Sequence, residues 1–519
     1  MGTVQTPWMG GQSTGGGAPD GRRMRAWRMA LAAALVVYLS TMARGVLWGD
    51  SGEAQLHTAA SGWIVDGQIA RSHVLFYAMA RFLRWMFSLE PAIAANVVSA
   101  IAGALAVANV GWILSTFCAR RAAVAAGVAL WLFAHTPWQC STSADVIALT
   151  LALLSAELIA VLKFLESKNA VWFCVAGLIN GLGMSNHNLA MLMWPVYGGM
   201  AIQLPLWRVI GFREGVFAGL CFLIGAAPVL VLCVDDYRTR GDLLTTLQSW
   251  LVGRYGSKVA NVSSIPVLAG WSLAILALNF PSPLLCCGAF GARRMIERVK
   301  ESKTWLVLGG GLIYGVFGVR YSVADQHVFL APAMLFMVIV VTLGVQAFLE
   351  RTCALGWTVA IILCSLLSPL IYGASPAILK RLDIRLTRIP GRELVYRDRF
   401  SWYVRPWRCG YDGAERFARE TLESLPQGAV LVADPTLATP LAYMQSVRGL
   451  RGDVWIDSWA IGPDARKKIE AMPTHDEAIR TEKLFVGTND PKYLPGWLLK
   501  RCYVFEPSGH VFQVRVAGL

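Results

Sequence analysis

The chain has few charged residues. They make up 15% of its 519 residues, whereas a soluble globular protein carries about a quarter. Hydrophobic residues reach 55%, so the folded chain would leave large apolar patches in water. Apolar runs of the length that spans a bilayer as a helix recur along the chain. The composition excludes a soluble globular protein and predicts a helical protein that crosses a membrane many times.

Several patterns that identify other classes of protein are missing. None of the eleven cysteines forms a Cys-x-x-Cys pair, and most lie in apolar runs, where cysteine behaves as a small hydrophobe. Cys409 and Cys502 lie in the C-terminal region, where they form either a disulfide or two free thiols. No ligand pair has the spacing typical of a metal site. We therefore predict no cofactor, with a divalent ion held by carboxylates and histidines as the alternative.

The net charge of +14 does not indicate a nucleic-acid partner, because the basic residues cluster between apolar runs. Such clusters are typical of cytoplasmic loops. About eleven membrane spans are expected. The lipid bilayer is therefore the predicted partner in place of a nucleic acid. The predicted ranges of the spans are 29–46, 92–117, 121–137, 144–164, 170–185, 188–206, 214–234, 264–289, 304–319, 327–349 and 354–373.

Charge also predicts the topology. If the N-terminus is cytoplasmic, every even-numbered loop is cytoplasmic and every one is basic, as the positive-inside rule requires. Residues 1–25 then form a disordered cytoplasmic tail, and 26–373 form the transmembrane domain. The first extracytoplasmic loop is 48–90, whose stretch 54–88 is amphipathic and predicts one or two helices at the membrane surface.

The composition changes after Tyr372, where arginine, acidic residues and proline become frequent. Gly428–Ala433 has the pattern of a buried strand and Gly413–Leu425 that of an amphipathic helix. Residues 374–519 are therefore predicted to form a small extracytoplasmic α/β domain. We expect a multi-pass protein of the inner membrane of the cell, with this domain outside the cytoplasm.

The polar residues that interrupt the apolar pattern all fall on the extracytoplasmic side of this topology. Ionisable groups near lipid are costly, so their presence there suggests a function. The candidate site residues are Asp50, Glu53, His73, Asp145, His187, Arg320, Tyr321, Asp325 and His327.

Some of these residues have structural explanations as well. Asp145 follows three hydroxyl residues and could cap the next helix. His187 lies in an Asn-His-Asn turn that could be only a tight connection, and Arg320 could be a snorkelling anchor. The pair Asp235 and Asp236 is expected to lie in a solvated loop.

Asp50 favours a function more strongly, because it lies in a Gly-Asp-Ser-Gly-Glu turn whose backbone could approach a ligand closely. A carboxylate can act as the base for an acceptor hydroxyl. Arginine and histidine can stabilise a phosphate leaving group. The residues alone therefore predict a polar site at the outer leaflet, suited to an anionic lipid-linked substrate.

Several motifs resemble a known family. Trp48-Gly-Asp-Ser-Gly-Glu53, with His73 twenty residues later, resembles the opening of the protein O-mannosyltransferase family that has a vertebrate transmembrane member, within the GT-C superfamily of membrane glycosyltransferases. Segments 138–149, 181–189, 321–333 and 440–455 are similar to later stretches of that family, in the same order.

The resemblance implies a GT-C fold and an inverting transfer of a mannose-like sugar from a polyprenyl-phosphate monosaccharide to an extracytoplasmic acceptor. The acceptor could be a protein Ser/Thr, a glycolipid or a polymer. It implies that Asp50 is the base, with Glu53 beside it. His73, Asp145, His187, Asp325 and His327 would line the site, and the donor and a protein or glycan acceptor would be its partners.

The chain departs from the family pattern at two places. The family usually follows the first-loop histidine with Pro-Pro-Gly, whereas this chain has Val74 and Leu75. Asp145 stands where the family usually has glutamate, which shortens the reach of the carboxylate. Either change could alter specificity or abolish activity.

Two other functions remain open. A transporter or flippase of a lipid-linked substrate would carry charged or broken helices near mid-membrane and repeat symmetry, and neither is evident in the sequence. A non-catalytic membrane scaffold would tolerate replacement of Asp50.

Overall fold

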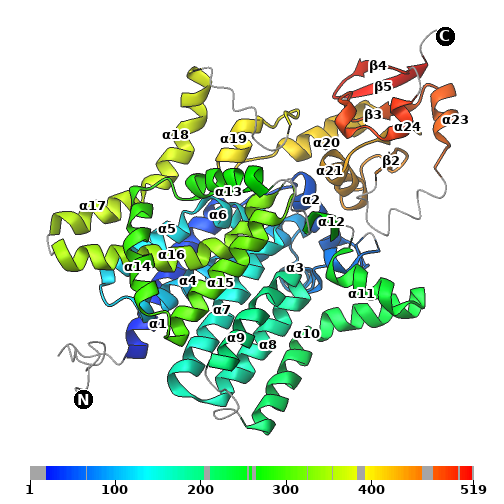
Figure 1. Cartoon of the computed structure of the whole chain (residues 1–519). Helices are drawn as coiled ribbons and strands as arrows, with labels where there is room; N and C mark the ends of the chain where they lie inside the picture. The colour runs from blue at the N-terminus through cyan, green and yellow to red at the C-terminus, as the bar shows by residue number, and fades with distance from the viewer. Residues whose placement is uncertain are drawn as a thin grey trace, which may run out of the picture.

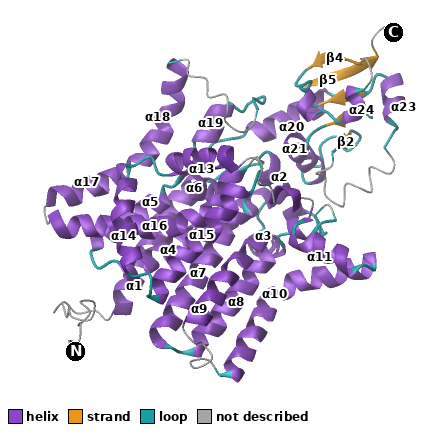
Figure 2. Ribbon diagram, viewed as in Figure 1, coloured by secondary structure: helices purple, strands orange, loops and turns teal. Residues whose placement is uncertain are grey.

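The computed structural model describes residues 19–65, 67–203, 211–253, 256–259, 265–323, 325–352, 355–382, 392–458, 472–500 and 503–516. These residues form a large helical part and a small domain with a sheet at one end (Figures 1 and 2). The predicted fold class, a polytopic helical protein with a small C-terminal α/β domain, is confirmed. Most of the predicted tail, residues 1–18, lies outside the described residues, and a helix already begins at Pro19.

The helical part begins with a long helix, two α-helices and one 3-10 turn of the first loop, and a second long helix. The helices of the helical part are α1 (Pro19–Thr41), α2 (Gly49–Ala59), η1 (Ile69–Arg71), α3 (Val74–Phe87), α4 (Pro91–Phe117), α5 (Arg121–Leu132), α6 (His135–Thr142), α7 (Val146–Ser167), α8 (Ala170–Asn186), η2 (Asn188–Met193), α9 (Trp194–Gln203), α10 (Phe212–Arg240), α11 (Leu243–Leu251), α12 (Gly256–Val259), α13 (Ile265–Asn279), η5 (Pro283–Cys287), α14 (Gly288–Glu297), α15 (Ser302–Arg320), α16 (Gln326–Thr352), α17 (Leu355–Ser365) and α18 (Leu367–Arg381).

Five of the described helices are long and apolar enough to cross a membrane, or up to seven spans if each of two bent pairs counts as one. The five are α4, α7, α10, α15 and α16. The count of eleven therefore stays a prediction. Some predicted spans are interrupted: 121–137 divides into α5 and α6, and 188–206 begins as the 3-10 helix η2.

The predicted span 264–289 is not one straight helix. Helix α13 ends at Asn279, and the chain turns by 116° before it continues as η5 and α14. Pro281 and Pro283 explain the break, because neither ring nitrogen can donate to a helical carbonyl. Ser282 caps the new segment by accepting a hydrogen bond from the Leu284 amide at 3.3 Å. The predicted span 354–373 is likewise bent, by 44°, between α17 and α18.

The C-terminal domain is a five-stranded sheet in the order β2-β1-β3-β5-β4. Its first three strands are parallel and the remaining pairs are antiparallel. The elements of this part of the chain are α19 (Arg399–Val404), α20 (Gly413–Ser424), β1 (Val430–Val432), α21 (Pro435–Ser446), β2 (Trp455–Asp457), α23 (His475–Arg480), β3 (Leu484–Val486), η6 (Pro491–Tyr493), α24 (Gly496–Leu499), β4 (Tyr503–Ser508) and β5 (Val511–Val516).

Side chains of the central strand alternate between the two faces of the sheet, as the period of a strand requires. Leu431 packs in a core with α20 and α21, while Val430 and Val432 pack in a second core on the opposite face. The predicted strand at 428–433 and the predicted helix at 413–425 are therefore confirmed.

Helix α21 joins the sheet domain to the helical part. The Thr439 hydroxyl donates to the Gly49 carbonyl at 3.3 Å, at the start of α2. Beside it, the Tyr443 hydroxyl donates to Glu90, before α4, at 3.0 Å, and Arg448 forms an ion pair with the same carboxylate at 2.9 Å. Helix α2 thus lies between the sheet domain and the membrane helices (Figure 1).

Candidate active site

The glycines of the Gly-Asp-Ser-Gly-Glu motif have separate structural roles. Gly49 has a φ of +56°, a left-handed conformation that glycine adopts most readily. A Cβ atom on Gly52 would lie 2.4 Å from the Leu47 carbonyl oxygen and 2.7 Å from the Thr439 hydroxyl. The motif therefore turns the chain into α2 and lets α2 pack closely against α21, which fixes the position of Asp50.

Asp50 occupies the first turn of α2 and is exposed to solvent within a crowded part of the molecule. Desolvation by the surrounding protein raises the pKa of Asp50 to about 7, with further contributions from the negative charges of Asp325 and Glu53. A nearby arginine, Arg71, opposes this rise. Asp50 is therefore a carboxyl group that solvent reaches and that changes protonation near neutral pH.

Glu53 lies one turn further along α2 and is bound to Arg71. Arg71 Nη2 is 2.8 Å and 2.7 Å from the two carboxylate oxygens of Glu53. Glu53 also lies 3.8 Å from His57 Nε2. Both the His57 contact and the Arg71 charge lower the pKa of Glu53, and together they outweigh the effect of its burial.

Sequence reasoning treated Arg71 as one residue of an amphipathic stretch and did not predict its part in the site. The only available signal was a lone arginine two residues before His73.

Two further aspartates complete the acidic group. Asp145 caps α7, because its Oδ1 accepts a hydrogen bond from the Ile147 amide at 2.8 Å. Its charge also acts on Asp50 and on Asp325. Asp325 lies just before α16, and burial raises its pKa to about 6, with Asp145 adding to the rise. The structure thus brings Asp50, Asp145 and Asp325 together from three distant parts of the sequence.

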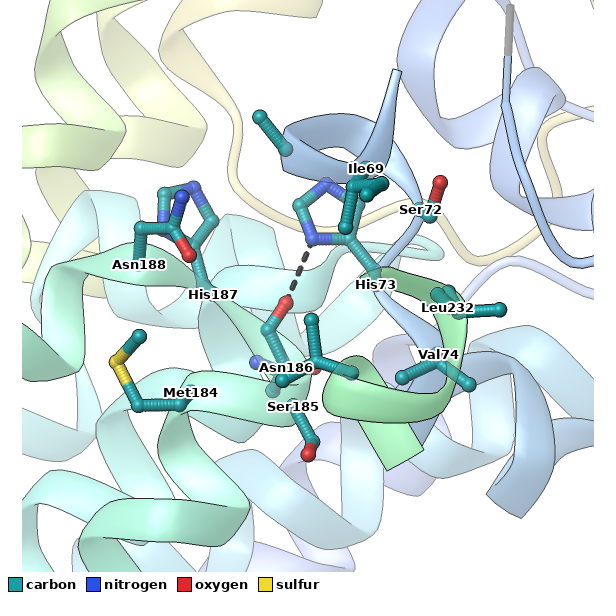
Figure 3. A pocket seen from close by; sticks show the side chains of 12 residues that line it. Ile69, Ser72, His73, Val74, Met184, Ser185, Asn186, His187, Asn188 and Leu232 are labelled. Atoms are coloured by element: carbon teal, nitrogen blue, oxygen red, sulfur yellow. Dashed lines mark hydrogen bonds between the residues drawn. The ribbon is translucent and has the colours of Figure 1, made fainter. Parts of the chain in front are cut away.

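The two predicted histidines lie side by side (Figure 3). His73 Nδ1 is 2.7 Å from the Asn186 carbonyl oxygen, so this nitrogen is the donor. The rings of His73 and His187 stack with centroids 5.3 Å apart and an angle of 19°. His187 Nδ1 accepts from the Leu189 amide at 3.1 Å. Burial lowers the pKa of His73 to about 4 and that of His187 to about 3, so both are neutral at pH 7.

The backbone of His73 is strained. Its φ of 27° lies in the left-handed region, which is uncommon for residues other than glycine. Strain of this kind is found most often at functional sites, and it costs of order 1–3 kcal/mol. Val74 begins α3 directly after it, so His73 ends the loop in this chain.

Tyr321 approaches the histidine pair through an aromatic neighbour. Its ring lies 4.5 Å from that of Phe329, which in turn lies 5.9 Å from His187. Arg320 ends α15, and its Nε is enclosed by protein but has no hydrogen-bond partner among the described residues. The guanidinium therefore keeps a donor that a ligand could use.

His327 belongs to a different group of side chains. Its ring lies 5.8 Å from Tyr403, and the Tyr403 carbonyl is in turn 2.7 Å from His135 Nε2. These contacts place His327 beside the segment that precedes the sheet domain. Within the described ranges, His327 makes none of the contacts that connect the other candidate residues with Asp50 or with His187.

Asp236 is not in a solvated loop: α10 continues to Arg240, whose Nε is 2.7 Å from Asp236, and Thr246 donates to the same carboxylate at 3.1 Å. That expectation was wrong because the helix extends about one turn beyond its apolar run. Cys409 is a free, exposed thiol, and Cys502 lies outside the described residues.

No group of three or more metal-ligating side chains occurs in the part of the chain that the structure describes. An apolar cavity of about 500 Å³ lies between α13, α15 and α16. Leu273, Gly311, Gly315 and Phe336 are among its lining residues, and so is Val319, which directly precedes Arg320. The cavity therefore runs along α15 to the end of the helix that carries Arg320.

No family model and no curated protein matches the chain. Among solved structures it is similar to ArnT from Cupriavidus metallidurans bound to undecaprenyl phosphate, with a TM-score of 0.57, 12% identity, and coverage of 94% of this chain and 97% of that one. The apo state of the same protein gives a TM-score of 0.56 with the same identity and coverage. A weaker likeness, with a TM-score of 0.46, 12% identity, and coverage of 85% of this chain and 64% of that one, is to the archaeal oligosaccharyltransferase AglB from Archaeoglobus fulgidus. The likeness to ArnT shows that the chain shares the fold of that protein.

Proposed function

We propose that the protein is a membrane glycosyltransferase that moves a monosaccharide from a polyprenyl-phosphate donor to a hydroxyl group of an extracytoplasmic acceptor. The observation that carries the proposal is the arrangement around Asp50, a solvent-accessible carboxyl with a pKa of about 7 among further acidic groups. The fold supports it, because one of the similar solved structures is ArnT with undecaprenyl phosphate bound.

In this proposal the ionised carboxylate of Asp50 accepts the proton of the acceptor hydroxyl as the oxygen attacks the anomeric carbon of the sugar. The new bond joins that oxygen to the anomeric carbon, and the bond from the anomeric carbon to the phosphate oxygen breaks. The electron pair leaves with the polyprenyl phosphate, and the proton stays on Asp50. Attack opposite to the leaving group inverts the anomeric centre.

Glu53 acts in this proposal as a positioning residue, because its carboxylate is already bound to Arg71. The ion pair joins α2 to the segment that leads into His73 and so orients both. Asp145 and Asp325 lie close enough to Asp50 for their charges to raise its pKa, and carboxylates are suited to accept hydrogen bonds from sugar hydroxyls.

The donor phosphate needs a cation, and Arg320 has an enclosed nitrogen without a partner among the described residues. The cavity along α15 ends beside this residue and could take the apolar part of the donor. Tyr321 directly follows Arg320 in the chain, and the ring of Phe329 lies between those of Tyr321 and His187, so both residues could contact the sugar or the phosphate.

In its specific form, the proposal is that the sugar is mannose-like and that the acceptor is a protein Ser/Thr. This form rests on the resemblance of the Trp48–Glu53 motif to the protein O-mannosyltransferase family. The inner membrane, with the active site and residues 374–519 outside the cytoplasm, is the proposed location. It rests on the basic loops.

The proposal is tested by a transfer assay with purified protein and radiolabelled polyprenyl-phosphate mannose, glucose or arabinose. Membrane and periplasmic extracts serve as acceptors. Asp50→Asn should abolish transfer, because the amide cannot accept the proton, while the near-isosteric side chain should leave folding intact. Transfer by Asp50→Asn at the rate of the unmodified protein would overturn the assignment of the base. Failure of all three donors would favour the transporter or scaffold.

A further inference from the structure

A second polar group lies far from the candidate active site, inside a helix that is apolar enough to span the membrane. Glu157 is in the middle of α7 and is only 2% exposed. It lies twelve residues beyond Asp145, or about 18 Å along the helix axis. An ionisable side chain in such a position is costly and is a candidate functional residue by default.

The hydrogen bonds of Glu157 satisfy one carboxylate oxygen and not the other. Asn180 Nδ2 donates to Oε1 at 3.0 Å, and the Tyr197 hydroxyl donates to the same oxygen. Oε2 has no hydrogen-bond partner, and no lysine, arginine or histidine forms an ion pair with Glu157, within the described ranges. A purely structural bridge between α7, α8 and α9 would not need this free oxygen.

A cavity adjoins this carboxyl group. Its volume is about 280 Å³, and it lies between α7, α8, α9 and α10, which pack side by side (Figure 1). Its polar lining residues are Glu157, Asn180, Tyr197 and Trp194, and its other walls are apolar.

The cavity also has open space and a route to the surface. Gly215 and Gly219 of α10 line it, and a Cβ atom on either would meet no atom within 4 Å. Trp194 is 44% exposed, so the cavity reaches the surface of the helical part.

We propose that this cavity binds a lipid or other amphiphile that has an aliphatic chain and a hydroxyl group, with the hydroxyl on Glu157. The apolar walls match the chain, and the free oxygen of Glu157 matches the hydroxyl. A hydroxyl can donate to the ionised carboxylate, whereas an ether oxygen can only accept, so the two groups are distinguished at an alkaline pH at which Glu157 is ionised. The site does not use Asp50 and does not depend on the proposed transfer reaction.

The test compares two photoreactive probes on the full-length protein in nanodiscs. One probe is a long-chain primary alcohol that carries a diazirine, and the other is its methyl ether, which cannot donate a hydrogen bond. Mass spectrometry then measures labelling of peptides from α8 and α10. The alcohol should label these peptides about tenfold more than the ether, the factor expected of a hydrogen bond to a buried carboxyl group.

Variants separate the carboxyl group from the cavity. Glu157→Leu should reduce the alcohol-to-ether ratio to about one, while Glu157→Gln should keep part of the preference, because the amide still donates and accepts. If Glu157→Leu fails to fold, Gly219→Leu keeps the test, because it fills the cavity without touching the carboxyl group.

Gly270→Leu in α13 is the matched control, because it also projects into open space in an apolar helix but does not line the cavity. Labelling should fall in Gly219→Leu and stay unchanged in Gly270→Leu. Equal labelling by the alcohol and the ether in the unmodified protein would overturn the proposal. A preference that survives in Glu157→Leu would do the same.

Discussion

Replacement of Asp325 by asparagine should lower the pH at which sugar transfer begins. In the proposed mechanism Asp50 serves as a base only when ionised, and its pKa is about 7. After desolvation, Asp325 is the largest cause of this raised value. Asparagine removes the negative charge and keeps the size of the side chain, so the pKa of Asp50 should fall.

The shift expected from the loss of one nearby like charge is about one unit. A fall of the Asp50 pKa from about 7 to about 6 would raise the ionised fraction at pH 6 from about one tenth to about one half. Since Asp325 itself has a pKa of about 6, the unmodified pair should show two overlapping ionisations and the variant only one.

The assay measures the rate of label transfer at a series of pH values. The quantity compared is the pH midpoint of the rate curve, not the maximal rate. A midpoint is informative even if Asp325→Asn also weakens sugar binding and slows the reaction at every pH. Asp235→Asn, an exposed aspartate of α10 that is not among the charges acting on Asp50, is the control and should leave the midpoint unchanged. A midpoint that stays in place or moves to higher pH in Asp325→Asn would refute the reasoning.

The same change should affect stability. The pKa values of Asp50 and Asp325 are both raised on folding, so folding favours their protonated forms. The unfolded chain therefore loses these protons first as the pH rises, and the folded state becomes relatively less stable above about pH 4. Asp325→Asn removes one of the two groups, and its melting temperature should exceed that of the unmodified protein at pH 8 but not at pH 3.

Three further changes test other parts of the site. Gly52→Ala should cost about 1–3 kcal/mol, measured as a lower denaturation midpoint, because the new methyl group would overlap the Leu47 carbonyl oxygen. Arg71→Met should cost about 3–5 kcal/mol, since it leaves Glu53 buried without its partner, and the double change with Glu53→Gln should recover much of the loss. Arg320→Ala should weaken donor binding at least about tenfold in a direct binding assay. An unchanged affinity would count against its contact with the phosphate.

The position of Asp50 illustrates what the sequence could predict. A short motif of glycines, a carboxylate and a hydroxyl residue at the end of an apolar run indicated a turn close to a ligand, and α2 begins at that turn. The sequence could not show that Gly52 contacts Thr439, because that contact joins parts of the chain hundreds of residues apart. Local patterns report local geometry, whereas tertiary contacts depend on the whole fold.

The grouping of candidates shows the same limit. His73 and His187 were predicted separately, and nothing in their spacing indicated that their rings stack. Arg71 was hidden among the arginines of an amphipathic stretch, although it binds Glu53. Pairing depends on which side chains face each other, and the periodicity of apolar residues carries no information on that.

The broken helices had a signal that was not used. Pro281 and Pro283 lie within the predicted span 264–289, and two prolines so close together seldom continue a helix. A window of hydropathy measures the average apolar character of a segment and ignores its geometry. Hydropathy does not single out Glu157 for the same reason, because a single acidic residue hardly changes the mean over a long apolar run.

The contact between α2 and α21 has a consequence for the synthesis of the protein. The Gly49 carbonyl and the Thr439 hydroxyl that bonds to it are 390 residues apart in the chain. At the usual rate of translation, about 5–20 residues per second, the ribosome takes roughly 20–80 seconds to make that interval. During this time Asp50 has already left the ribosome, but the surface that holds its helix does not yet exist. If the protein has the proposed function, sugar transfer should begin only after its last domain has folded.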